Sequence, residues 1–292
     1  MIPLLQTLLD GLVLGGVYAF AAVGFSLIFG VLGVVNLTHG VFVVLGAYAA
    51  LLLHEVVGLD PILGLPLVMA ALFALGYLYQ RTLIAAAVER ASLVASLLVT
   101  FGVALMARNL LQIVASPDVR SIATAYSFAG LSLGPLRIDL VRAAGLLTSL
   151  LLLFGLALLL NRTAFGRAIR ATAQQPVGAA LSGVNVRHVH GLTFGLGGAF
   201  AGASGAVIGM MLPFTPSSEA AWTLNAFVVV TLGGVGSPQG ALLGGLLLGV
   251  IATLTAQYVG PAFQNAAMFL VLVLMLLLRP QGLLGHAFAA SR

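Results

Sequence analysis

The chain alternates between long apolar stretches and short polar breaks along almost its whole length. One membrane crossing takes about 20 apolar residues. The apolar stretches are 11–32, 41–54, 61–80, 93–115, 141–160, 190–212, 220–235, 240–258 and 262–278. We therefore predict an all-α polytopic membrane protein with one transmembrane domain over residues 1–292 and about 8–10 transmembrane helices.

Two of these stretches, 41–54 and 220–235, are short for independent crossings. We expect them to be short, tilted or broken helices buried among the others, since irregular backbone is tolerated at membrane depth where it lines a cavity.

Composition supports the membrane assignment and narrows the chemistry. Apolar types make up 61% of the residues and charged types 7%, whereas a soluble domain carries roughly 25% charged residues. A soluble domain, a nucleic-acid binder and a disordered chain are excluded. The chain has no lysine and no cysteine, which excludes a phosphate-loop lysine, disulfides and thiolate metal sites. The opening MIPLLQTLLDG lacks a positive n-region, so we expect no cleaved leader.

Arginines predict the orientation of the chain. With nine crossings, one side holds Arg81, Arg90, Arg162, Arg167, Arg170, Arg187, Arg279 and Arg292. The other side holds three arginines and most of the acids, and Arg108 falls inside an apolar stretch. Because cytoplasmic loops carry the excess of basic residues, we expect the N-terminus outside and the C-terminus inside. The acids, Glu219 included, fall in or next to loops, which weighs against an ion-coupled secondary transporter.

Two polar breaks resemble each other at an offset of 200 residues: 33–40 reads GVVNLTHG and 233–240 reads GGVGSPQG. An internal repeat with interrupted helices is a common transporter plan, and chance in a glycine-rich chain is the alternative. The candidate gate or pathway residues in these breaks are Asn36, Thr38, His39, Ser237 and Gln239. Ordinary turns at the cytoplasmic surface are the other interpretation.

Glycines four residues apart predict helices that pack closely. They are Gly198, Gly202, Gly205, Gly209, Gly240 and Gly244.

The sequence GASG at 202–205 also matches the GxSG of rhomboid-type intramembrane serine proteases. No histidine lies on a later apolar stretch to serve Ser204 as a base, so we interpret Ser204 as a packing residue. His188 and His190 lack the i, i+4 spacing of a helical metal pair, and we predict no metal site.

The loop at 161–189 predicts two short helices. Ala164–Ala173 would carry Arg167 and Arg170 on one face, and Pro176 would end it. A second turn over Val177–Leu181 would stop at Ser182 and Gly183. This loop is long for a plain connector, which indicates a docking element; an amphipathic helix held by lipid headgroups is the alternative.

Long blocks of the chain resemble permease subunits of bacterial branched-chain amino acid ABC importers, of the LivH type. They are GLVLGGVYAFAAVGFSLIFGVLGVVNLTHGVFVVLGAY, GRAIRATAQQPVGAALSGVNVRHV, LTFGLGGAFAGASGAVIGMM, TLGGVGSPQGALLGGLLLG and LRPQGLLG. The resemblance implies a non-catalytic subunit of the bacterial inner membrane. It pairs with a LivM-like second permease, two ABC ATPase subunits and a periplasmic substrate-binding protein.

The resemblance also implies roles for particular residues. The loop helix would be the coupling helix, carried over to Gly166, Arg167, Arg170 and Gly183. This chain departs from the family where Thr38 stands in VNLTHG and where Pro176 follows Gln175. ATP would be bound by the partner subunits, and no cofactor is expected in this chain. The substrates would be branched-chain amino acids or related small solutes, since the family also serves urea, amides and organic acids.

Overall fold

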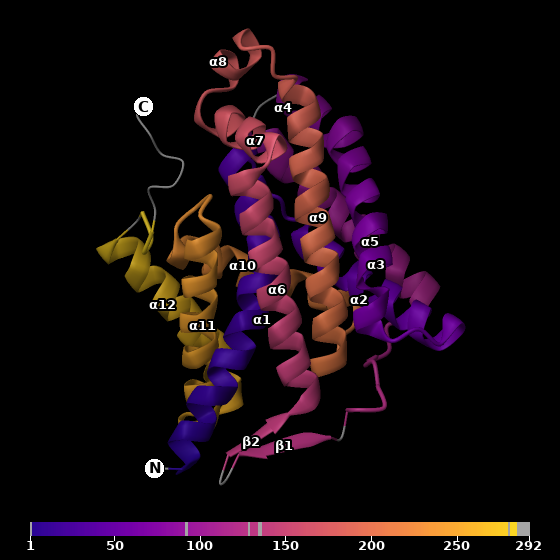
Figure 1. The fold of residues 1–292 in the computed structure, drawn as a ribbon, viewed down its shortest axis with the longest axis vertical. Coiled ribbons are helices and arrows are strands. Elements are labelled where there is room, and N and C mark those ends of the chain that lie inside the picture. Colours follow the sequence, from indigo (N-terminus) through magenta and orange to yellow (C-terminus); the bar gives the residue numbers. More distant parts are fainter. Residues whose placement is uncertain (1, 91–92, 128, 134–135, 280, 285–292) are drawn as a thin grey trace.

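The computed structural model describes residues 2–90, 93–127, 129–133, 136–279 and 281–284, and most of them lie in a bundle of long helices (Figure 1). The long helices are α1 (Ile2–Leu32), α2 (His39–Val57), α3 (Pro61–Tyr79), α5 (Leu93–Ala115), α6 (Leu140–Arg162), α9 (Val186–Met211), α10 (Glu219–Gly233), α11 (Pro238–Tyr258) and α12 (Gln264–Leu278). The short ones are α4 (Ala85–Arg90), α7 (Ala164–Gln174) and α8 (Pro176–Leu181). His286 and Arg292 lie outside the described residues.

Eight helices in the described part of the chain are long and apolar enough to cross a membrane, which confirms the predicted polytopic all-α class. The exception among the nine long helices is α10. Its 15 residues extend about 22 Å, less than the roughly 30 Å hydrocarbon core of a bilayer. Helix α12 also has 15 residues, but the turn Pro261–Phe263 directly before it extends the crossing to 18 residues.

The centre of the bundle consists of α1 and α9, which are the most buried of the membrane-spanning helices. Helix α1 packs against α11, α9, α10 and α6, while α9 also packs against α2 and α3. Helices α5 and α12 are the least buried. Their apolar outer faces fit contact with lipid or another subunit.

The two ends of the bundle differ in what they carry. Figure 1 shows the N-terminus beside a short hairpin at one end, and α4, α7 and α8 at the other. The hairpin pairs β1 (Gly130–Leu133) antiparallel with β2 (Leu136–Asp139), and the sequence analysis did not predict it. Gln6 fixes it to α1, because its side chain donates to the Arg137 carbonyl at 2.7 Å and accepts from the Arg137 N–H at 3.0 Å.

The break after α1 turns the chain back into the bundle. Gly33 adopts a positive φ of 67° at the end of α1, a conformation that costs glycine little. The imidazole of His39 then lies against the Ala21 carbonyl at 2.8 Å. Ala21 is about 16 Å before the end of α1, at 1.5 Å per residue. Helix α2 therefore begins deep inside the bundle.

The break between α10 and α11 is a tight turn of a different kind. The backbones of Gly233 and Gly240 touch, and the Ser237 hydroxyl caps α11 by accepting the Gly240 N–H at 2.9 Å. The two breaks that resemble each other in sequence thus have different geometries. The break after α1 folds into the bundle, whereas the break between α10 and α11 is a turn that reverses the chain.

Glycines allow the central helices to touch backbone to backbone. A Cβ at Gly205 of α9 would overlap the Val43 carbonyl oxygen of α2, and one at Gly244 of α11 would overlap the Val229 carbonyl oxygen of α10. Gly198 of α9 lies against the Leu72 carbonyl oxygen of α3, and Gly202 lies against the Leu72 side chain. These contacts are what small residues four apart permit in a membrane helix.

We predict that Gly205→Ala lowers the stability of the purified protein by about 1–3 kcal/mol, because the added methyl forces α9 away from α2. Gly102→Ala on α5 is the matched control, since a Cβ there meets no atom within 4 Å. The measurement is the midpoint of thermal unfolding in detergent. Equal midpoints for the two variants would contradict the close approach of α9 and α2.

Candidate functional site

The first polar break forms a buried cluster at the start of α2. Asn36, Thr38 and His39 are each only 1% exposed. The Asn36 side-chain oxygen accepts the Thr38 N–H at 3.1 Å and also the Thr38 hydroxyl. With His39 against Ala21, this cluster lies in the interior of the bundle and is no surface turn.

The first turn of α10 packs against the first turn of α2. The Gly40 N–H donates to the Thr223 hydroxyl at 2.8 Å, and that hydroxyl lies 3.3 Å from the Leu37 carbonyl. Trp222 meets Tyr18 of α1 edge to face, with ring centroids 6.0 Å apart. Two helix N-termini therefore converge beside the middle of α1, and both direct the positive ends of their dipoles to this place.

An ion pair lies at this junction. Arg108 Nη1 of α5 is 3.5 Å from Glu219 Oε1, at the first residue of α10. The Glu219 side chain is 6% exposed and that of Arg108 is 31% exposed. Glu219 lies next to a loop, as expected, since it is the first residue of α10 and follows the turn Pro216–Ser218. The chain folds back after α9, however, and carries this residue into the bundle, where it is buried. Because one acid is buried in the bundle, the positions of the acids give no argument against an ion-coupled carrier.

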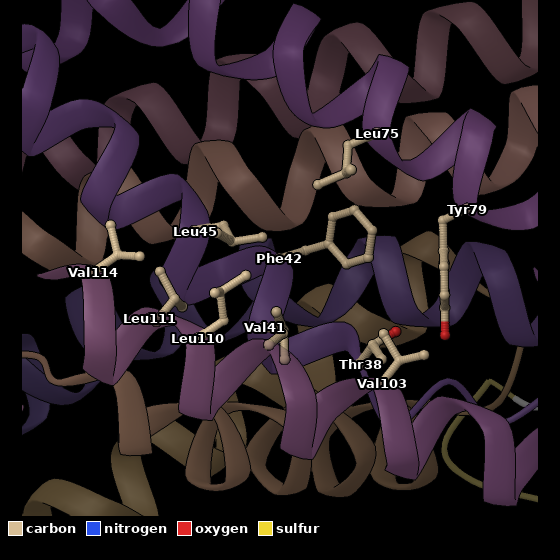
Figure 2. Close-up of a pocket in the computed structure, with 11 residues that line it drawn as sticks. Thr38, Val41, Phe42, Leu45, Leu75, Tyr79, Val103, Leu110, Leu111 and Val114 are labelled. Atoms are coloured by element: carbon tan, nitrogen blue, oxygen red, sulfur yellow. The ribbon is translucent and has the colours of Figure 1, made fainter.

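An apolar cavity of about 340 Å³ lies between α2, α3 and α5 (Figure 2). Its lining is almost entirely aliphatic and aromatic. The lining residues are Thr38, Val41, Phe42, Leu45, Leu75, Tyr79, Val103, Ala107, Leu110, Leu111 and Val114. Figure 2 shows the hydroxyl groups of Thr38 and Tyr79 at one end of the cavity and Val114 at the other.

The structure does not bring the second polar break to this site. Ser237 and Gln239 line a separate cavity of about 220 Å³ with Asn161 and Arg170. Gly236 touches Gly30 of α1, nine residues beyond Ala21 and so about 13 Å along the helix. The five candidate gate residues thus divide into an interior group and a group near the end of the bundle.

The loop at 161–189 folds into α7 and α8, close to the predicted bounds. Gly166 is buried against the Leu159 and Leu160 carbonyls, and Gly183 ends α8 with a φ of 84°. Arg167 is exposed, but Arg170 turns inward and donates to the Leu160 carbonyl. The two arginines therefore do not present one shared free face, contrary to the prediction.

Helix α8 carries exposed apolar residues that the sequence analysis did not single out. Val177 is 69% exposed and Leu181 is 87% exposed. They project at the end of the bundle that carries the arginine-rich loop (Figure 1). In the sequence, the spacing of four residues between Val177 and Leu181 could have indicated a shared helix face. A helix of only six residues makes that spacing weak evidence.

Ser204 has the surroundings of a packing residue. It is fully buried, and its hydroxyl donates to the Ala201 carbonyl of its own helix at 2.7 Å. The Nδ1 atom of His188 forms a hydrogen bond with the Tyr77 hydroxyl, at 3.0 Å. Within the described ranges, no three histidine or acidic side chains gather as metal ligands would.

Comparison with known proteins connects this architecture to a family. The family described as branched-chain amino acid transport system / permease component matches residues 7–278. The high-affinity branched-chain amino acid transport system permease protein BraD of Pseudomonas aeruginosa is 31% identical, over 97% of this chain and 96% of that protein. LivH of Escherichia coli K12 is 28% identical over the same shares. LivM of that organism is 28% identical over 92% of this chain and 68% of its own length.

A solved structure shares the fold. It is PsaBC from Streptococcus pneumoniae in complex with Fab, with a TM-score of 0.52 and 12% sequence identity, over 95% of this chain and 92% of that chain. The identity is too low to carry more than the fold. The match over residues 7–278 and the identity to BraD carry the assignment: this chain belongs to the family of permease components of branched-chain amino acid transport systems.

Proposed function

We propose that this chain is the transmembrane permease subunit of an ABC importer and forms a pore with a second permease. The observation that carries the proposal is the family match, which extends over nearly the whole chain and nearly the whole of BraD and LivH. The cargo would be branched-chain amino acids or related small solutes. The chain itself would carry out no covalent chemistry.

The partners follow from the same proposal. LivM aligns along most of this chain, which supports a second permease of similar fold beside the exposed apolar helices. Two ABC ATPase subunits would bind ATP, and a periplasmic binding protein would deliver the solute. This chain would hold no cofactor of its own.

The proposal is tested with the complete complex in lipid vesicles. We predict that uptake of a branched-chain amino acid requires ATP and both ATPase subunits. An imposed proton or sodium gradient without ATP should give no uptake. Gradient-driven uptake by this chain alone would contradict the proposal and favour an ion-coupled carrier.

We further propose that the end carrying α4, α7 and α8 faces the cytoplasm of a bacterial inner membrane. The arginine-rich segments 81–90 and 161–189 lie together at this end (Figure 1). Arg137 and Arg142 lie at the opposite end, where Arg142 pairs with Asp10 of α1 at 3.3 Å. The positive-inside rule then places the N-terminus outside and the C-terminus inside.

Reporter fusions test this orientation. We predict that a fusion after Arg170 reads as cytoplasmic and that a fusion after Arg120 reads as periplasmic. The difference arises because loops rich in arginine are retained on the cytoplasmic side during insertion. A periplasmic reading after Arg170 would contradict the orientation.

The α7–α8 segment would be the element that docks on an ATPase subunit. Arg167 offers an exposed charge, and Val177 and Leu181 offer apolar side chains that no part of the described chain covers well. The inward bond of Arg170 to Leu160 and the close fit of Gly166 instead attach α7 to α6. A movement of the docked ATPase would thus be transmitted to the end of a membrane helix.

We predict that Arg167→Glu weakens this docking. Reversing a charge at a complementary interface can cost several kcal/mol, so co-purification of the ATPases should fall, or ATP hydrolysis should no longer depend on the solute. Arg162→Glu is the control, because Arg162 is an exposed arginine at the end of α6, outside α7 and α8. Wild-type co-purification and coupling in Arg167→Glu, or equal loss in both variants, would exclude this face as the docking site.

A further inference from the structure

A further cavity, of about 310 Å³, lies between the end of α1, α4 and the first turn of α9, at the end of the bundle that carries α7 and α8 (Figure 1). Three polar residues, Gln80, Arg187 and His190, line it together with six aliphatic residues. Leu32 and Val186 are among these six, and they are the terminal residues of two membrane-spanning helices. The cavity therefore lies at the depth where the acyl chains of a bilayer meet the headgroups.

Two polar atoms at this cavity have no hydrogen-bond partner in the described part of the chain. Gln80 is only 2% exposed, and its Oε1 atom accepts no hydrogen bond. The Nε2 atom of His190 is also buried without a partner. An amide oxygen can only accept, and Nε2 of a neutral imidazole accepts when the ring proton is on Nδ1. Because native proteins rarely leave buried polar groups unsatisfied, both atoms require a donor from outside the chain.

Arg187 adds a positive group to the same cavity. It is exposed in the first turn of α9. A guanidinium has several N–H donors and matches the geometry of a phosphate, so Arg187 can bind a phosphate oxygen while it keeps its contacts within the chain. The lining thus combines an aliphatic wall, one cation and two acceptors.

The backbone at Gln80 is unusual. Gln80 begins the π-helical turn η1 (Gln80–Ile84), which directly follows α3. Such turns are rare, and many of them occur at functional sites. The unpartnered amide and the irregular turn therefore coincide at one residue of the cavity wall.

We propose that this cavity binds a phosphatidylethanolamine molecule from the adjacent leaflet of the membrane. The phosphate would pair with Arg187, and the ammonium would donate to Gln80 Oε1 and His190 Nε2. The aliphatic wall would contact the glycerol backbone and the start of an acyl chain. The volume is within the range of small-molecule pockets, roughly 300–1,000 Å³. This inference concerns a lipid and does not depend on which solute is transported.

Headgroup chemistry distinguishes this lipid from others. Phosphatidylcholine carries the same phosphate, but its quaternary ammonium has no N–H to donate. Phosphatidylglycerol offers hydroxyl groups in place of the ammonium, and neutral donors form weaker hydrogen bonds than charged ones. Water would satisfy the two acceptors but would gain nothing from the aliphatic wall. A zwitterionic lipid with N–H donors satisfies all parts of the lining.

The first test measures which lipid the complete complex retains. The complex is reconstituted in an equal mixture of phosphatidylethanolamine and phosphatidylcholine, extracted in mild detergent and analysed for bound lipid by mass spectrometry. Wild type should retain phosphatidylethanolamine over phosphatidylcholine by about 10-fold or more, since a hydrogen bond to a charged group contributes about that much to an equilibrium constant.

Gln80→Met is the variant for this test, because it removes the acceptor and leaves a side chain of similar length. Its retained lipid should have the composition of the mixture. Gln239→Met is the matched control, since Gln239 is an exposed glutamine that lines a separate cavity at the same end of the bundle. Its preference for phosphatidylethanolamine should equal that of wild type.

The second test distinguishes a lipid from water or a soluble ligand. The thermal midpoint of wild type in nanodiscs should rise when phosphatidylethanolamine replaces phosphatidylcholine, because a ligand that binds the folded state stabilises it. The midpoint of Gln80→Met should not change between the two lipids. Soluble phosphoethanolamine added to wild type in phosphatidylcholine should leave the midpoint unchanged, because it has no acyl chain for the aliphatic wall.

The outcomes leave the proposed function untouched, since none of them measures uptake. Equal retention of the two lipids by wild type, or an undiminished preference in Gln80→Met, would overturn the lipid site. Equal midpoints of wild type in the two lipids would indicate that water satisfies the acceptors. A shift produced by soluble phosphoethanolamine alone would overturn the assignment to a lipid.

Discussion

A bilayer offers no water to hydrogen-bond an open backbone, so a helix that begins inside the membrane must find its partners within the protein. Helix α2 meets this constraint by means of side chains. Asn36 accepts the Thr38 N–H, and the Thr223 hydroxyl accepts the Gly40 N–H. The arrangement requires α10 to begin at the same depth, because Thr223 is in its first turns. The two interrupted helices therefore depend on each other.

The close contacts of the central helices hold this junction in place. Helix α9 approaches α2 at Gly205, and α11 approaches α10 at Gly244. A junction fixed by backbone contacts on both sides can keep Glu219 within reach of Arg108, although α5 itself is among the least buried helices. The closely packed part of the site is thus α2 with α10. The helix that carries Arg108 lies at the outside of the bundle.

The sequence alone predicted the positions of the nine long helices and the two short ones of the 161–189 loop, because apolar runs, prolines and glycines are local signals. It did not predict the depth of the break at Asn36–His39. A polar interruption shows where a helix stops, but not whether the chain then leaves the membrane or folds back. For the same reason the burial of Glu219, next to a loop, was not predicted, since its partner Arg108 is distant in sequence. Arg170 was misjudged because helical spacing gives a shared face but not the local carbonyl of Leu160 that holds its side chain.

The convergence of α2 and α10 beside the middle of α1 is the central claim, and the natural absence of cysteine makes a direct measurement possible. A double variant with Tyr18→Cys and Trp222→Cys in the same chain can be treated in membranes with a short reagent that links two thiols. The account predicts efficient cross-linking, because these two rings are 6.0 Å apart, and none for the pair Leu32→Cys and Trp222→Cys at the end of α1. Cross-linking of the second pair but not the first would place the start of α10 at the end of the bundle and contradict the account.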